Sequence, residues 1–354
     1  MNEDKSKTGD FLKVLFKLAP EFQEIFIERY EILKIVNMIE PVGRRILSVK
    51  MDISERIIRK ETDKLKENKL LDTTLKGMII TDEGKKVLEE IDKLYHMFKG
   101  IDESEKILAD YLGIKKVIIA PLNLDDDKMV LSSIGECASK YLMKIINDKS
   151  IIGITGGSSV QSVIERLNVK SKKYRDVKII PTRGSLGDKA EYQSNTLAEI
   201  LANKLSCNYK LLSTPDKLSE GTIKELQNEP EIRETINLIN SIDTLVFGIG
   251  RSDIMAKRRG LYVDEMKMIQ DKGAVAEAFG YYFNSLGEVV HEINTIGIDL
   301  HKFKQTKNLI AVAGGIEKVE AIRAITKLDS KLVLVTDENV ASEILKDFRR
   351  RKNG

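Results

Sequence analysis

The stretch IIGITGGSSVQSVIERL, residues Ile151 to Leu167, joins an apolar run to a helical pattern through two glycines and two serines. A short apolar run that ends at glycine is typical of a strand buried on both faces of a sheet. Further runs of this kind are KVIIAP, VKIIPTRG, TLVFGIG, NLIAVAGG and KLVLVTDE, and segments with helical periodicity separate them. This alternation predicts the α/β class, with a doubly wound, Rossmann-like parallel sheet.

The chain has 354 residues, a length that suits two or three domains. Its pattern changes near residues 100–115 from charged and helical to strand-rich, and GIDESEKILADYLGI at this point predicts a short connecting helix. We therefore predict a first domain over residues 1–100, which includes a linker or dimerisation helix, and a second domain over residues 101–354.

The composition indicates a folded globular protein, with 42% hydrophobic and 32% charged residues. A net charge of +3 excludes a globally basic nucleic-acid coat but permits a local basic patch. Two cysteines, Cys137 and Cys207, cannot form a disulfide framework and favour a reducing compartment. The first ten residues are polar, and no apolar run approaches the roughly 20 residues that cross a bilayer. We expect a cytoplasmic protein without a membrane partner.

Two helical patterns separated by a short break occupy Glu40 to Asp72. Ser54 is a natural N-cap for the second helix, in which Ile57, Ile58 and Leu65 are predicted to face the core. The following LLDTTLKGMIITDEGKKVL predicts two short strands around a turn and then another helix. Helix, turn, helix and β-hairpin is the order of a winged helix-turn-helix domain, whose second helix enters the DNA major groove.

Residues 42–70 carry nine Lys or Arg and five Asp or Glu, a net charge of +4. Such local positive charge is what contact with DNA phosphates requires, although a plain charged helical bundle would show it too. Within this set, Arg56, Arg59 and Lys60 are candidates for base or phosphate contact, whereas Arg44 and Arg45 suit the DNA backbone. The complete set of candidate DNA contacts is Arg44, Arg45, Ser54, Arg56, Arg59 and Lys60.

The helix after the hairpin carries a possible dimerisation seam. Val87, Ile91, Leu94 and Phe98 are spaced four, three and four residues apart. This spacing suits a helix that pairs with its symmetry mate, and packing on its own domain explains it equally well. Because operators usually mirror a two-fold protein, we expect a homodimer formed here or through the large domain.

Glycines and cations follow several predicted strands of the second domain, where ligands of open parallel sheets bind. The loop Gly156–Ser159 can form an anion site from free amides at a helix start and two hydroxyls, or it is simply a tight turn. Arg183 and Lys318 follow other strands, and several cations together suit two phosphates. Only one of Arg258 and Arg259 is expected to face inward, because adjacent helical residues point about 100° apart.

Other kinds of site are poorly supported. GITGGSS and GIGRSD both miss the dinucleotide fingerprint G-x-G-x-x-G, and no P-loop motif occurs. No Cys/His cluster has zinc spacing, and the chain has three histidines, so we expect neither a metal nor a cofactor. Glu277 is the best-placed carboxylate; it could accept hydrogen bonds from sugar hydroxyls, act as a general base, or lie on the surface.

Taken together, the motifs resemble the sorbitol-operon-regulator (SorC) family of bacterial sugar-responsive repressors over nearly the whole chain. The resemblance rests on EPVGRRILSVKMDISERIIRKE, GITGGSSVQSV, PTRGSLGD, QSNT, IMAKRRG, AEAFGYYFN and AVAGGIEKVEAI. It implies a winged-helix DNA-binding domain joined to a sugar-phosphate sensor that resembles sugar-phosphate isomerases and deaminases but serves regulation, not catalysis. The implied effector is fructose 1,6-bisphosphate, which would relieve repression of glycolytic genes.

Motif matching also implies which residues contact the effector, and the implied partners are operator DNA, the phosphosugar and further copies of the chain as a dimer or, on DNA, a tetramer. The implied effector contacts are Gly156, Gly157, Ser158, Ser159, Arg183, Gln193, Arg258, Arg259, Glu277 and Lys318. Two alternatives stay open: a sugar-phosphate isomerase or deaminase-like enzyme, and a repressor that senses a different phosphosugar.

Overall fold

The computed structural model describes residues 14–15, 17–121, 127–169, 174–186 and 189–353. The polar first ten residues lie outside this range, as do Gly187 and Asp188 of the PTRGSLGD motif. The chain forms two compact units, one of Met1–Ser104 with Pro121–Met129 and one of Glu105–Ala120 with Val130–Gly354. Within the described ranges, no helix combines the length and apolar character needed to span a bilayer.

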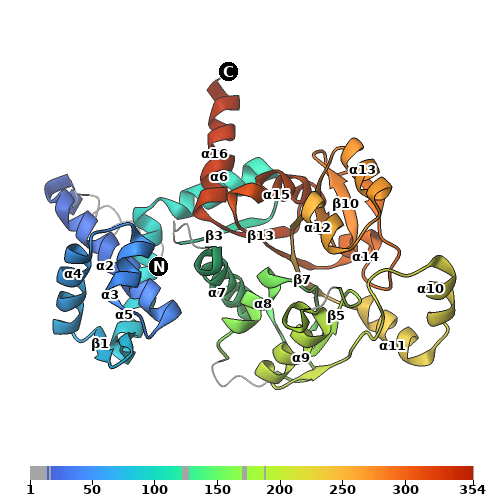
Figure 1. The fold of residues 1–354 in the computed structure, drawn as a ribbon, viewed down its shortest axis with the longest axis horizontal. Coiled ribbons are helices and arrows are strands. Elements are labelled where there is room, and N and C mark those ends of the chain that lie inside the picture. The colour runs from blue at the N-terminus through green and yellow to red at the C-terminus, as the bar shows by residue number, and fades with distance from the viewer. Residues whose placement is uncertain (1–13, 16, 122–126, 170–173, 187–188, 354) are drawn as a thin grey trace. The chain divides into compact units, whose positions relative to one another are not determined.

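The first unit has the predicted order of helix, turn, helix and hairpin (Figure 1). Its elements are α2 (Pro20–Ile39), α3 (Arg44–Met51), α4 (Glu55–Glu67), β1 (Leu71–Thr74), β2 (Gly77–Ile80) and α5 (Asp82–Phe98). Val87, Ile91 and Leu94 of the possible dimerisation seam are half-buried on α5. Helix α5 packs on α2, where Tyr30 and Tyr95 stack with their ring centroids 4.0 Å apart.

The turn between α3 and α4 is built by local sequence. Asp52 takes the left-handed conformation that ends α3, and the Ser54 hydroxyl accepts a hydrogen bond from the Ile57 amide, 3.4 Å away, at the start of α4. Ile58 is buried as predicted, whereas the prediction that Ile57 faces the core is wrong, since its side chain is 40% exposed. The two residues differ because they point about 100° apart on the helix.

The hairpin is tied to the segment that precedes α3. Strands β1 and β2 pair antiparallel, and Val42 exchanges two backbone hydrogen bonds of 2.8 and 2.9 Å with Met78 on β2. A Cβ on Gly77 would lie 2.8 Å from the Val42 carbonyl carbon, and Gly77 has a φ of 142°. The turn therefore requires glycine for both space and backbone conformation.

An ion pair joins α2 to the middle of α4. Arg29 Nε lies 2.7 Å from Glu61 Oε2, and Glu61 is 1% exposed. Burial raises the pKa of the Glu61 carboxyl, but hydrogen bonds from Arg29 and Lys60 outweigh this and leave that pKa below its usual value. A carboxylate whose pKa is lowered by folding stabilises the fold above its unfolded pKa, and this contribution is lost as the pH falls through the folded pKa.

We predict that Glu61→Gln lowers the free energy of unfolding of the first unit by about 1–3 kcal/mol, because the buried Arg29 contact loses its charge. The loss should shrink as the pH is lowered toward the acid range. Amide hydrogen exchange in α2 and α4 would measure it, with Glu67→Gln as a control on the same helix, where both partners of the Lys64–Glu67 pair are exposed. Equal effects of the two substitutions would contradict the structural role of Glu61.

The second unit contains the predicted parallel sheet, with seven strands in the order β3-β13-β12-β7-β4-β5-β6. Every neighbouring pair in it is parallel. The strands are β3 (Lys116–Ala120), β4 (Ile151–Ile154), β5 (Lys178–Pro181), β6 (Asn208–Tyr209), β7 (Thr244–Gly248), β12 (Asn308–Val312) and β13 (Leu332–Asp337). Six of them coincide with the apolar runs of the sequence, and the two-residue edge strand β6 has no such run.

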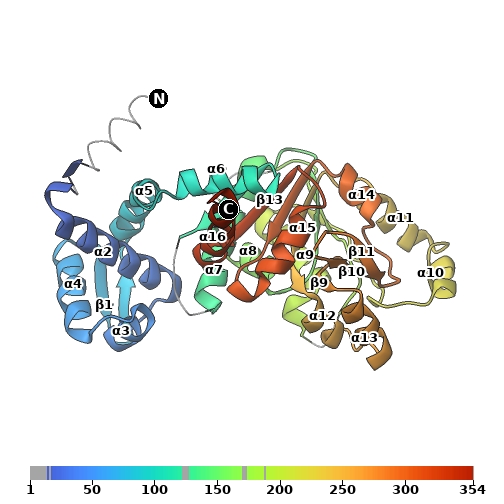
Figure 2. The same cartoon turned by 90° about the horizontal axis from the view of Figure 1, so that it is seen from above.

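Helices cover both faces of this sheet (Figures 1 and 2). They are α6 (Ile101–Leu112), α7 (Asp127–Ile145), α8 (Ser158–Glu165), α9 (Ser194–Leu205), α11 (Pro230–Ile239), α14 (Leu300–Gln305), α15 (Val319–Thr326) and α16 (Glu338–Asn353). The short helix α10 (Glu220–Leu226) lies at the edge of the unit, away from the sheet (Figures 1 and 2). Right-handed crossovers place α8 and α9, which link strands running toward β6, opposite α15, which links strands running toward β3. The direction reverses between β7 and β4, and this switch point is where such sheets bind ligands.

A second sheet was not predicted. Its four strands are antiparallel in the order β11-β10-β9-β8: β8 (Gly250–Arg251), β9 (Ala274–Ala278), β10 (Tyr281–Asn284) and β11 (Val289–Glu292). Helices α12 (Ser252–Arg258) and α13 (Val263–Asp271) lie between β8 and β9 in the chain. Leu261, Ile269 and Tyr282 belong to the small core of this region. The insertion between β7 and β12 places Glu277, on β9, against the switch point.

Candidate functional site

A cavity of about 440 Å³ lies at the carboxyl ends of the parallel strands. Its wall is formed by residues that follow β4, β5, β6, β7 and β12, together with the end of β9 and the turn after it. It includes all ten of the predicted effector contacts: Gly156, Gly157, Ser158, Ser159, Arg183, Gln193, Arg258, Arg259, Glu277 and Lys318. The structure thus brings these residues together, and their contact with an effector stays a prediction.

The N-terminus of α8 forms one side of the cavity. The first amides of a helix have no partner within the helix, and here those of Ser158 and Ser159 belong to the first turn after Gly157. Ser158 is exposed and Ser159 is 7% exposed. Ser158 and Ser159 line the cavity at the positive end of the α8 dipole, an arrangement that suits phosphate.

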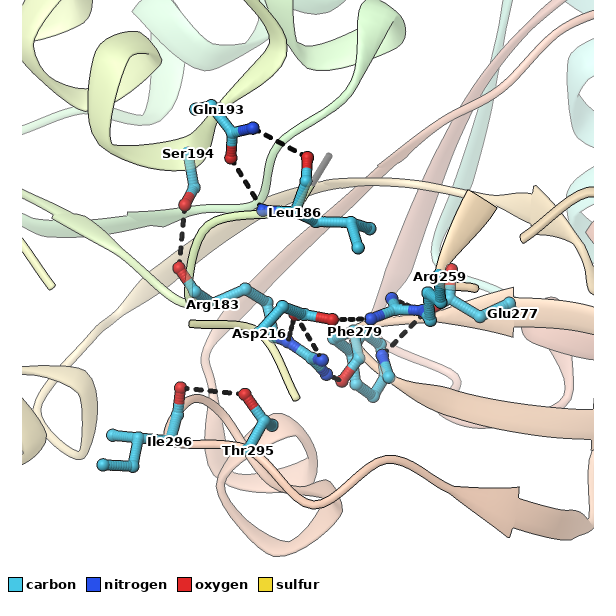
Figure 3. Close-up of polar contacts among 11 residues, drawn as sticks. Arg183, Leu186, Gln193, Ser194, Asp216, Arg259, Glu277, Phe279, Thr295 and Ile296 are labelled. Carbon is cyan, nitrogen blue, oxygen red and sulfur yellow. Dashed lines mark hydrogen bonds and ion pairs between the residues drawn. The ribbon is translucent and has the colours of Figure 1, made fainter. Parts of the chain in front are cut away.

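Gly156 and Gly157 owe their position to a neighbouring loop. A Cβ on Gly156 would lie 2.5 Å from the Tyr192 carbonyl oxygen, and the Gly157 amide donates to that oxygen over 2.9 Å. The next residue, Gln193, accepts from the Leu186 amide at 2.8 Å and donates to the Leu186 carbonyl at 2.7 Å (Figure 3). Gln193 thus lines the cavity and also fixes the loop that follows β5.

Arg183 is 5% exposed, and its side chain is held by two other segments (Figure 3). Its Nε and Nη2 donate to Asp216 Oδ1 at 3.0 and 2.6 Å, and its Nη1 donates to the Phe279 carbonyl. Burial, with a smaller contribution from the neighbouring Arg259 cation, lowers the pKa of the Arg183 guanidinium to about 9. Ion pairing offsets the cost of burial, because an isolated buried cation is strongly unfavourable.

Arg259 completes a buried cluster of four charged residues, which we call the ion cluster: Arg183, Asp216, Arg259 and Glu277. Arg259 Nη1 pairs with Asp216 Oδ2, and its Nη2 lies 2.7 Å from Glu277 Oε1. Glu277 Oε1 also accepts from the Gly280 amide at 2.7 Å. Each of the four side chains is about 5% exposed.

The turn between β9 and β10 holds two members of this cluster. Phe279 and Gly280 both have positive φ, 39° and 91°, as a tight two-residue hairpin turn requires. Phe279 presents its carbonyl to Arg183, and Gly280 presents its amide to Glu277. The Phe279 ring stacks on Phe303 at a centroid distance of 4.9 Å, which anchors the turn in the core.

The cations at the mouth of the cavity are more exposed than those of the ion cluster. Arg258 is exposed and Lys318 is half-buried, and neither has a carboxylate within ion-pair distance among the described residues. Arg251 pairs with the exposed Asp253, with Nη2 and Oδ2 2.7 Å apart. The prediction that only one of Arg258 and Arg259 faces inward agrees with the burial of the Arg259 side chain, although both residues line the cavity.

The predicted set of effector contacts leaves out Asp216, Arg251 and Phe279, all of which line the cavity. Arg251 lies in the quoted GIGRSD but is absent from the predicted set of contacts. Asp216 follows Pro215 in a loop remote from any strand motif, and no local pattern marks it. Phe279 lies next to a glycine in AEAFGYYFN, which is a weak turn signal that could have been used.

The predicted DNA contacts of the first unit fall into two groups. Arg45, Arg56 and Arg59 are exposed, and no ion pair involving them is found among the described residues. Arg44 pairs with Asp63, and Lys60 Nζ lies 3.2 Å from Glu61 Oε1. Ser54 serves as the N-cap of α4.

Comparison with known proteins assigns both units. Residues 25–95 match the family model "CggR N-terminal DNA binding domain", and residues 96–346 match "Putative sugar-binding domain". The chain is 39% identical over 331 residues to the central glycolytic genes regulator of Bacillus subtilis, covering 94% of this chain and 97% of that one. It is 35% identical over 338 residues to the protein of the same name from Priestia megaterium, covering 95% and 98%.

Solved structures of similar proteins agree with this assignment. A "putative SorC family transcriptional regulator" from Enterococcus faecalis matches with a TM-score of 0.64 and 36% identity, covering 69% of this chain and 99% of that one. The full-length sorbitol operon regulator SorC from Klebsiella pneumoniae shares the fold, with a TM-score of 0.65 and 20% identity over 86% and 94% of the two chains. These findings define a transcriptional regulator with an N-terminal DNA-binding domain and a sugar-binding domain. The chain belongs to the central glycolytic genes regulator family, within the SorC group.

Gly280 offers a test of how the ion cluster is held. A Cβ at this position would overlap Arg183 Nη1, in addition to the strain of a positive φ. The matched control is Gly273, which has a φ of 70° and where an added Cβ would meet no atom within 4 Å.

We predict that Gly273→Ala lowers the free energy of unfolding by about 1–2 kcal/mol, the cost of a left-handed L-residue. Gly280→Ala should cost at least about 1 kcal/mol more, because the Arg183 hydrogen bond to Phe279 is displaced. Chemical unfolding of the full chain would measure both values. Equal losses would show that the Arg183 contact adds nothing to stability.

Proposed function

We propose that this protein represses central glycolytic genes by binding operator DNA through its first unit, and that a phosphorylated sugar bound in the cavity relieves the repression. The favoured effector is fructose 1,6-bisphosphate. The observation that carries the proposal is one cavity that joins the N-terminus of α8 to Arg258 and Lys318, cations without a carboxylate partner among the described residues. Its volume of about 440 Å³ lies in the range of small-molecule sites.

The curated relatives support the regulatory part of the proposal, since both are named central glycolytic genes regulators. Glu277 lines the cavity, and its Oε1 oxygen accepts hydrogen bonds from Arg259 and from the Gly280 amide. A carboxylate held in this way suits hydrogen bonds from sugar hydroxyls, because an ionised carboxylate only accepts.

Binding of the effector and binding of operator DNA are thermodynamically linked in this proposal. An effector can weaken operator binding only if it binds the DNA-competent arrangement less tightly than another arrangement. We propose that the functional assembly is a dimer, or a tetramer on DNA, because bacterial operators commonly mirror a two-fold protein.

We expect fructose 1,6-bisphosphate to weaken operator binding by about 5–150-fold at fixed salt, the usual range of allosteric coupling. Fluorescence anisotropy with DNA from upstream of a glycolytic operon would measure this, and fructose 6-phosphate and inorganic phosphate would serve as comparison ligands. Operator binding that is indifferent to all three would leave the DNA-binding assignment intact and refute the proposed effector class. If NMR showed that the protein converts the sugar phosphate into a product, the alternative that the protein is an enzyme would be favoured.

Arg59 tests the placement of the DNA-reading helix. We expect Arg59→Ala to reduce operator affinity and to make the log–log salt slope shallower by about 0.9, the value of one phosphate contact. Effector affinity should not change. Lys64→Ala is the matched control, because Lys64 lies farther along α4 and pairs with Glu67 at 2.7 Å. If Lys64→Ala weakens operator binding as much as Arg59→Ala does, the first turns of α4 do not enter the groove.

A further inference from the structure

The ion cluster has no net formal charge. The two arginines, Arg183 and Arg259, are matched by Asp216 and Glu277, and Asp216 bridges both guanidiniums. All three guanidinium nitrogens of Arg183 already donate to protein oxygens. The two buried arginines are therefore not free cations that wait for a phosphate.

The ion cluster offers a ligand both hydrogen-bond donors and hydrogen-bond acceptors. Each guanidinium keeps some N–H donors without a protein acceptor, because five donors are available and three at most are used. The carboxylates of Asp216 and Glu277 keep unused lone pairs beside them. A sugar hydroxyl both donates and accepts and so suits this surface. A phosphate dianion only accepts hydrogen bonds, and here the two carboxylates offset the attraction that the two guanidiniums would exert on it.

Charge suited to phosphate lies elsewhere in the same cavity. The first turn of α8 offers amides and hydroxyls, and the mouth carries Arg258 and Lys318, which have no carboxylate partners in the part of the chain that the structure describes. Glu317 also lines the cavity beside Lys318, but the lining cations Arg251, Arg258 and Lys318 outnumber it. The cavity therefore has a buried end with no net formal charge and a mouth with more cations than carboxylates.

The position of Asp216 is fixed by its own backbone. Its amide donates to the Ser185 carbonyl over 3.0 Å, and the Ser185 amide in turn donates to the Thr214 carbonyl over 3.0 Å. A Cβ on Gly184 would lie 2.5 Å from the Pro215 carbonyl oxygen. This close approach of two loops brings the carboxylate against Arg183, one residue before Gly184.

We propose that Asp216 is a specificity-determining positioning residue, which holds Arg183 and Arg259 so that the buried end of the cavity binds sugar hydroxyls and the phosphates bind at α8 and the mouth. This inference rests on the proposed function, namely that the cavity binds a phosphorylated sugar. On this inference, Asp216 makes the cavity prefer a bisphosphate whose carbon chain carries hydroxyls over a bisphosphate whose carbon chain carries none.

The test compares two ligands that carry the same phosphates. Fructose 1,6-bisphosphate carries hydroxyls on the carbons between its two phosphates, and hexane-1,6-diol bisphosphate carries none. Isothermal titration calorimetry on the full chain would give the ratio of their dissociation constants for the wild type, Asp216→Asn and Asp253→Asn. Asp253 is the matched control, because it also pairs with an arginine of the cavity wall, Arg251, and its replacement changes the net charge equally, but at an exposed side chain outside the cavity lining.

For the wild type, we expect the hydroxyl-free ligand to bind at least about tenfold more weakly, since the buried donors and acceptors are then left without partners. In Asp216→Asn this ratio should fall by about tenfold, because fructose 1,6-bisphosphate loses affinity while the bare bisphosphate does not. The ratio of Asp253→Asn should stay within about twofold of the wild type. If Asp216→Asn tightens both ligands equally, the arginines grip phosphate and the inference is wrong. The inference would also be wrong if Asp253→Asn lowered this ratio as much as Asp216→Asn does.

Asp216 is buried, so its replacement could unfold the second unit, which circular dichroism would reveal. In that case Arg258→Gln and Lys318→Gln test the division of the cavity into two ends, because both residues lie at its mouth. Each should weaken the two bisphosphates in parallel and leave their ratio unchanged. A loss confined to fructose 1,6-bisphosphate, or no loss at all, would refute the division into two ends. A wild-type protein that binds neither bisphosphate would instead refute the proposed function itself.

Discussion

The carboxylate of Asp216, buried between two guanidiniums, is the constraint on which the cavity depends. Arg183 and Arg259 are each about 5% exposed, and burying either without a partner would be strongly unfavourable. The loop that carries Asp216 and the hairpin turn at Phe279 must therefore be in place before the cavity has its shape. Close approaches that only glycine permits, at Gly184 and Gly280, allow both segments to reach Arg183.

This arrangement explains why a small antiparallel sheet is inserted into a parallel one. The insertion between β7 and β12 supplies Arg259, Glu277 and the turn that fixes them, on the side of the cavity that faces the ends of β4 and β5. A doubly wound sheet alone offers strand ends, glycines and a helix N-terminus, which suit phosphate. The insertion adds buried charged groups, Arg259 and Glu277, that the parallel sheet alone does not supply.

Sequence patterns were reliable where one local signal decides the structure. Six of the seven parallel strands are short apolar runs, and Ser54 caps α4, because burial and capping are read from neighbouring residues. The antiparallel strands β9 and β10 gave no such signal, since AVAEAFGYYFN lacks clear alternation and its turn is Phe-Gly. Ile57 was misplaced because its apolar character suggested burial, whereas its position on the helix turns it toward solvent.

The sequence by itself determined the order of elements in the first unit and, through its motifs, a set of residues that do line one cavity. It did not determine how those residues share their charges. Asp216 lies 33 residues from Arg183 and 43 from Arg259, and nothing local to it indicates either partner. Only the tertiary structure decided that pairing, because a buried ion pair is set by which distant loops pack together, and packing depends on the whole fold rather than on any one segment.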